Sequence, residues 1–185
     1  MLSVKDKKKL LEIARESIRS YLENRERPSF DIEEKELRQK RGAFVTLNIN
    51  GRLRGCIGRI IADKSLYETI SQMAIQAAFY DPRFPQLREE EFKNVEIEIS
   101  ILSELKKIED IKEIKVGTDG ILIKKGYHQG LLLPQVATEY SWNRKTFLEH
   151  TCLKADLNKD AWDDKDTEIY IFSAEVFLEG ELKNE

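Results

Sequence analysis

A cysteine that lies between two glycines stands out in the segment LRGCIG, residues 53–58. Cys56 is one of only two cysteines in the chain, Gly55 and Gly58 lie on either side of it, and Arg54 precedes it by two positions. Glycines let a ligand approach the backbone, exposed amides hold anions, and a neighbouring guanidinium favours the thiolate form of cysteine. One hypothesis is that Cys56 is a catalytic nucleophile, with the flanking residues binding an anionic substrate.

Packing is the alternative role of Cys56. Cysteine is among the residues most often found buried, and glycines inside a strand often mark a β-bulge or a close approach to another segment. Side chains alternate between the two faces of a strand, so Arg54 and Cys56 share a face only where no bulge intervenes. The sequence leaves both roles open and predicts a backbone irregularity around Cys56.

A cysteine nucleophile needs a base, and the chain has two histidines, His128 and His150. His150 and Cys152 lie on one predicted helix about 200° apart, so they do not form a local pair. The two cysteines and two histidines match a zinc-ligand count, but they are scattered rather than closely spaced. The sequence therefore predicts no metal site and no cofactor, and it does not place a histidine next to Cys56.

The segment DPRF, residues 81–84, is a second candidate for binding. Asp81 and the proline after it mark a turn at the end of a predicted helix. The guanidinium of Arg83 has the shape to bind a carboxylate or a phosphate from a ligand. It also suits an internal ion pair with Asp81 that fixes the turn, and the sequence does not decide between the two.

Composition limits the class of protein. The chain has 185 residues, 41% of them hydrophobic, and a net charge of −3, which fits one compact domain without a generally basic surface. No apolar run suggests a signal peptide or a membrane span, so we expect a cytoplasmic protein with two free thiols. A basic stretch at residues 38–59 leaves a nucleic-acid-binding module as an alternative, acting through Arg41, Arg52 and Arg54.

Periodic patterns predict the elements that position these residues. Apolar residues at three- and four-residue steps predict helices at 3–23, from 66 to before Pro82, and at about 143–154. Asn50 and Gly51 between two apolar runs predict a β-hairpin, and alternation predicts a strand at 95–101. Further strands are expected in DGILI, GLLLPQV and EIYIFSAEVFL. The expected fold class is α+β with a largely antiparallel sheet and packed helices.

The motifs GAFVTL, LRGCIG, AAFYDPRFPQL, LLLPQVATEYSW and FLEHTCLKADL, in this order, resemble the AMMECR domain family over about residues 41–177. The resemblance implies one AMMECR-type domain over residues 1–185, with an α+β fold of two unequal lobes and no established reaction. The chain departs from the usual family pattern at Gln86 and at Asp156, where proline and glycine are common. Within the shared motifs, Gln135 and Trp142 are further candidates for lining a pocket.

Prokaryotic members of this family belong to the AmmeMemoRadiSam system, and that name implies a Memo-like protein and a radical-SAM protein as functional partners. The favoured hypothesis is an accessory or binding component that uses a cleft lined by LRGCIG and DPRF. The alternatives are an enzyme with Cys56 as nucleophile and a nucleic-acid-binding module. The sequence does not identify a substrate or an oligomeric state.

Overall fold

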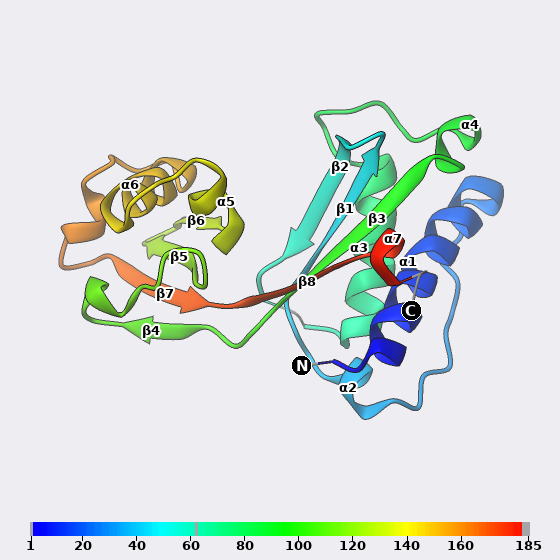
Figure 1. The fold of residues 1–185 in the computed structure, drawn as a ribbon, viewed down its shortest axis with the longest axis horizontal. Coiled ribbons are helices and arrows are strands. Elements are labelled where there is room, and N and C mark those ends of the chain that lie inside the picture. Colours follow the sequence, from blue (N-terminus) through cyan, green and yellow to red (C-terminus); the bar gives the residue numbers. More distant parts are fainter. Residues whose placement is uncertain (1, 62, 183–185) are drawn as a thin grey trace. The chain divides into compact units, whose positions relative to one another are not determined.

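The computed structural model describes residues 2–61 and 63–182, and it divides into two compact units. The first unit combines residues up to 102 with those from 175 onward, and the second contains residues 103–174. Each unit is built around a four-stranded sheet (Figure 1). The predicted α+β class with antiparallel pairing is confirmed, although two sheets take the place of one. None of the described helices is long and apolar enough to cross a lipid bilayer.

The sheet of the first unit contains the LRGCIG motif, and the DPRF motif lies in the chain between two of its strands. Its strands are β1 (Ala43–Ile49), β2 (Arg52–Arg59), β3 (Val95–Leu102) and β8 (Ala174–Leu178), in the spatial order β2-β1-β3-β8. The predicted hairpin joins β1 to β2, and Asn50 and Gly51 in its turn have φ angles of 52° and 73°. Positive φ at both central residues is the requirement that Asn-Gly satisfies best. β2 is first in this order, so it is an edge strand that pairs with β1 alone among the described strands.

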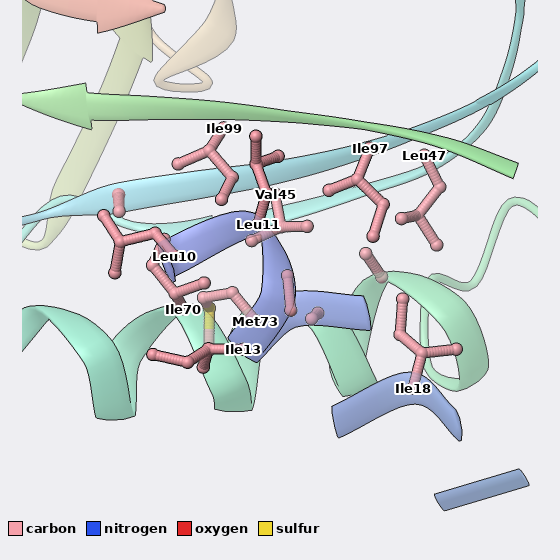
Figure 2. Packing of buried hydrophobic residues seen from close by; sticks show 14 of the residues in the cluster. Leu10, Leu11, Ile13, Ile18, Val45, Leu47, Ile70, Met73, Ile97 and Ile99 are labelled. Carbon is pink, nitrogen blue, oxygen red and sulfur yellow. The ribbon is translucent and has the colours of Figure 1, made fainter. Parts of the chain in front are cut away.

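Two long helices cover one face of this sheet: α1 (Val4–Asn24) and α3 (Leu66–Phe79). Both begin with a capping box, Ser3 with Asp6 and Ser65 with Glu68. Alternate residues of β1 and β3, including Val45 and Ile99, point toward the helices and are fully buried with them (Figure 2). The opposite face of β1 carries the partly buried Phe44, Thr46 and Asn48.

Three short helices lie in segments where the sequence predicted no element. They are α2 (Lys35–Arg38), α4 (Glu89–Phe92) and α7 (Glu179–Leu182). Each has four residues, which is too short for an apolar periodicity to repeat. α4 matters for the site because it lies in the segment between DPRF and β3.

The second unit contains β4 (Lys106–Ile108), β5 (Gly120–Lys125), β6 (His128–Leu132) and β7 (Glu168–Phe172), in the order β4-β7-β5-β6. Its helices are α5 (Pro134–Glu139) and α6 (Arg144–Lys154), with the 3-10 turns η1 (Ile111–Glu113) and η2 (Ala161–Asp163). Phe147, Leu148 and Cys152 of α6 are completely buried against Ile121 and Ile123 of β5. Asp156 has a φ of 56°, the left-handed conformation for which glycine is favoured.

Two expected strands differ in the structure. The run EIYIFSAEVFL forms two strands in two sheets, β7 and β8, separated by Ser173. In GLLLPQV the strand ends at Leu132 and Pro134 begins helix α5, because proline suits the first turn of a helix and cannot donate to a strand ladder. β4 has three residues and was not predicted.

Candidate functional site

A β-bulge sets the direction in which Cys56 points. Leu47 pairs with Gly55 whereas Asn48 pairs with Leu53, so Arg54 is an extra residue in β2. In the register that starts at the hairpin turn, Cys56 would lie opposite the core residue Val45. The bulge shifts the register by one, which places Cys56 opposite Thr46, on the face away from α1 and α3. The predicted irregularity is present, two residues before the cysteine.

Arg54 is engaged within the protein instead of lying free beside the thiol. Arg54 is only 9% exposed. Its Nε and Nη2 donate to the two carboxylate oxygens of Glu91 in α4, at 2.9 and 3.1 Å. Nη2 also donates to the carbonyl of Pro85 at 2.9 Å. Hydrogen bonds from Arg54 lower the pKa of Glu91 to about 2. This buried ion pair fastens the segment after DPRF to β2.

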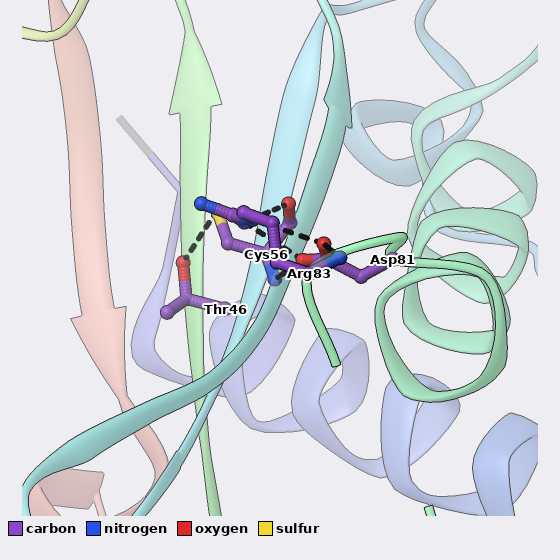
Figure 3. Close-up of polar contacts among 4 residues, drawn as sticks. All are labelled: Thr46, Cys56, Asp81 and Arg83. Atoms are coloured by element: carbon purple, nitrogen blue, oxygen red, sulfur yellow. Dashed lines mark hydrogen bonds and ion pairs between the residues drawn. The ribbon is translucent and has the colours of Figure 1, made fainter. Parts of the chain in front are cut away.

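Cys56 is a half-buried free thiol with three hydrogen-bonded neighbours (Figure 3). Thr46 Oγ1 donates to Sγ at 3.3 Å. The backbone N–H of Cys56 donates to Asp81 Oδ2 at 2.9 Å, and its carbonyl accepts from Arg83 Nη2 at 3.1 Å. Both backbone groups therefore point to the open edge of β2, where Asp81 and Arg83 occupy the place of a neighbouring strand.

Asp81 and Arg83 form a two-pronged ion pair. Arg83 Nε and Nη2 donate to Oδ1 and Oδ2 of Asp81 at 2.9 and 2.7 Å, and the backbone N–H of Arg83 donates to Oδ1 at 3.1 Å. These bonds from Arg83, aided by the amide of Cys56, hold the pKa of Asp81 well below its ordinary value, and Asp81 in turn raises the pKa of Arg83. The carboxylate is buried, whereas the side chain of Arg83 is 54% exposed.

Both glycines of LRGCIG permit close packing within the protein. A Cβ atom on Gly55 would lie 2.2 Å from the carbonyl oxygen of Ala77 in α3, and one on Gly58 would lie 2.2 Å from the ring of Phe44. No real side chain fits at such distances. The close approach expected from the sequence thus brings β2 against its own neighbours, α3 and β1.

The remaining candidates, Gln135 and Trp142, belong to the second unit. Gln135 lies in α5, and the ring of Trp142 stacks with those of Tyr140 and His150, with centroids 5.1 and 3.9 Å away. His128 Nδ1 lies 3.2 Å from the carbonyl oxygen of Ala155. Both histidines are thus in the second unit, whereas Cys56 is in the first.

The buried thiol of the second unit is Cys152, and its environment differs from that of Cys56. Cys152 has no solvent exposure, and burial raises its pKa to about 11.

Among residues 2–61 and 63–182, no three His, Cys, Asp or Glu side chains come together in a group that could hold a metal ion.

Three hollows of about 360, 350 and 650 Å³ lie along α1, and a fourth of about 120 Å³ lies beside α3. None of these four is lined by Cys56 or Arg83, so the cleft expected at LRGCIG stays a prediction. The basic stretch is partly used within the chain, since Arg41 donates to the carbonyl of Leu102 and Arg59 pairs with Asp63.

Thr46 and Glu91 are site residues that sequence reasoning missed. Counting pairs from the hairpin turn places Thr46 opposite Gly55, whereas the bulge moves it opposite Cys56. Apart from the glycines, no sequence pattern marks the bulge. Glu91 lies 37 positions after Arg54 and is one acid in the run EEE, so nothing in the sequence marks it as the partner.

Comparisons with known proteins agree over nearly the whole chain. The AMMECR1 family model matches residues 11–177. A protein of Methanosarcina mazei is 41% identical over all of this chain and 97% of its own length, and one of Pyrococcus furiosus is 44% identical over 92% and 86%. The crystal structure of an uncharacterised protein from Pyrococcus horikoshii matches with a TM-score of 0.86 and 41% identity, covering 92% of this chain and 89% of that one.

Proposed function

Because the chain belongs to the AMMECR1 family, we propose that it is a binding component that docks to a Memo-like protein and a radical-SAM protein through the surface around Cys56. The partners follow from the family's AmmeMemoRadiSam system. The docking surface is the exposed part of the cluster formed by Thr46, Cys56, Asp81 and Arg83, here called the Cys56 cluster.

One observation carries this proposal: the groups that would support catalysis at Cys56 are already engaged. The amide of Cys56 donates to Asp81, so it is not free to stabilise an oxyanion, and Arg54 is held by Glu91. The exposed guanidinium of Arg83 is fixed by its bonds to Asp81 and to the Cys56 carbonyl. A rigid and partly charged surface of this kind suits recognition, since little side-chain freedom is lost on binding.

Binding of the purified proteins tests the proposal. Isothermal titration of the full chain with each partner from the same genome should give a dissociation constant, and Arg83→Gln should raise it about tenfold or more, as expected for an interface hot spot. Arg19→Gln is the matched control, because it removes the same charge from an exposed part of α1. Absence of binding to both wild-type partners would refute the docking function.

A second candidate function, a Cys56-dependent enzyme, is favoured by the hydrogen bond that Thr46 donates to Sγ. Such a bond stabilises a thiolate more than a thiol. The test is the pH dependence of Cys56 alkylation in a Cys152→Ser variant, with a denatured control. Rapid modification at a pH where the denatured cysteine is still slow supports an activated thiol, whereas protection until unfolding rules it out.

A further inference from the structure

We propose that Arg83, with the thiol of Cys56 and the hydroxyl of Thr46 beside it, forms a binding site for a small oxyanion, the oxygen of a carboxylate or a phosphate. The inference rests on the proposed function, since it states the chemistry of what this surface recognises. Of the two arginines that the sequence offers for binding an anion, Arg54 is already held by Glu91, which leaves Arg83.

The first step is the count of donors on Arg83. A guanidinium has five N–H groups. Nε uses one on Asp81, and Nη2 uses two, on Asp81 and on the carbonyl of Cys56. Within the described residues, the two N–H groups of Nη1 have no acceptor. They belong to a side chain that is 54% exposed, so an anion from solvent has access to them.

The second step is orientation. Three bonds hold the guanidinium plane, and the ring of Phe84 lies against it at 5.5 Å from Cζ to the centroid. The same ring contacts Arg54 from 5.9 Å, which makes it an apolar spacer next to both cations. A guanidinium fixed in this way binds an anion without first losing rotamer freedom, which is the benefit of preorganisation.

The third step is the local charge. Arg54, Arg83 and Arg88 pair with only two carboxylates, those of Asp81 and Glu91, so this linked group of side chains holds one more positive than negative charge. The other acids of α4, Glu89 and Glu90, lie outside the linked group. The hydrogen bond from Nη2 to the carbonyl of Cys56 brings the guanidinium to the residue that carries the thiol. Glu98 of β3 is the register partner of Thr46 and has an interaction of its own.

Cys56 itself can report on the site through two alkylating reagents, one charged and one neutral. Iodoacetate and iodoacetamide react in the same way: the thiolate sulfur attacks the CH₂ carbon, an S–C bond forms, the C–I bond breaks, iodide leaves, and the thiol proton goes to the buffer. Only iodoacetate carries a carboxylate. The ratio of the two rates therefore measures attraction of an oxyanion to the surroundings of Cys56, independently of the reactivity of the thiol.

We expect the iodoacetate-to-iodoacetamide rate ratio of folded Cys152→Ser protein to exceed the ratio in urea by about tenfold, equivalent to about 1.4 kcal/mol. Arg83→Gln should return the ratio to the unfolded value. Arg52→Gln, the same charge change four residues from Cys56 on β2, should leave most of the tenfold preference. Inorganic phosphate or acetate should slow only the iodoacetate reaction, and the stronger competitor identifies the source of the oxyanion; chloride at equal ionic strength controls for screening.

An unchanged ratio in the folded protein would overturn the oxyanion site, and so would protection of Cys56 from both reagents, since an anion at Arg83 lies beside the thiol. If Arg83→Gln does not fold, the competition by phosphate and acetate in the parent protein still decides. These outcomes are separate from partner binding: docking without anion preference leaves the proposed function standing, and anion preference without docking removes the partners.

Discussion

The backbone amide of Cys56 donates a 2.9 Å hydrogen bond to a carboxylate oxygen of Asp81, a residue 25 positions further along the chain. This bond joins LRGCIG to DPRF, the two most distinctive motifs of the sequence. With the return bond from Arg83 to the Cys56 carbonyl, it closes the edge of β2 by side chains. We expect these two bonds to contribute to the free energy of unfolding.

Asp81→Asn should lower the free energy of unfolding by about 1–3 kcal/mol, because the amide offers one oxygen and no charge to the four N–H groups that donate to Asp81. Glu16→Gln is the comparison, since Glu16 forms an exposed ion pair with Arg19 and its loss should cost about 0.5 kcal/mol or less. Urea unfolding of both variants measures the difference. Equal stability of the two variants would show that the Asp81 contacts do not hold the edge together.

Stability should fall as the solution becomes acidic, and Glu91 should account for part of the fall. Its pKa is about 2 when folded and near the ordinary 4.5 when unfolded, so the unfolded chain binds a proton first. The stabilisation is complete above about pH 5 and is lost as the pH falls toward 2. Asp81 contributes in the same direction. Urea midpoints between pH 7 and 2.5 should decline less steeply in Glu91→Gln; parallel curves would exclude a contribution from Glu91.

Gly55→Ala should destabilise the protein by about 1–3 kcal/mol, because the added methyl group would meet the Ala77 carbonyl and force β2 away from α3. The Ala77 carbonyl is part of the backbone of α3, so it cannot rotate out of the way as a flexible side chain can. Leu53→Ala, at a 44% exposed position of the same strand, should change stability by about 0.5 kcal/mol or less. A fully stable Gly55→Ala protein would contradict the packing of β2 on α3.

Cys152 should not react with a thiol reagent such as dithionitrobenzoate in the folded protein at pH 8. It has no exposed surface, and its pKa of about 11 keeps it protonated. A thiol titration should count no more than one reactive group in native protein and two in urea. Two rapidly reacting thiols in the native protein would mean that the core around α6 opens readily.

The regular parts of the fold could be predicted from sequence because their patterns repeat. α1 begins and ends within a residue of its expected bounds, since its apolar residues recur at three- and four-residue steps. The hairpin follows from Asn50 and Gly51, two residues that favour positive φ. The three four-residue helices and β4 could not be predicted, because an apolar pattern does not repeat often enough in so few residues.

Some members of the site could be predicted from the sequence, but their contacts could not. Cys56, Asp81 and Arg83 do come together, and the internal pairing of Arg83 with Asp81 was one of the stated alternatives. What the sequence could not give is the one-residue bulge at Arg54, which moves Cys56 from the core face to the face of Thr46. A single inserted residue leaves no periodic signal, yet it reverses every side chain beyond it in the strand.

The membership of β8 in the first sheet has a consequence for how the chain is made on the ribosome. β3 and β8 are neighbours, but the whole second unit, residues 103–174, is translated between them. β3 therefore remains an edge strand of the first sheet until about 70 further residues have emerged, which takes several seconds at usual rates of synthesis. The second unit is continuous in sequence, so it is able to finish folding before the unit that began first.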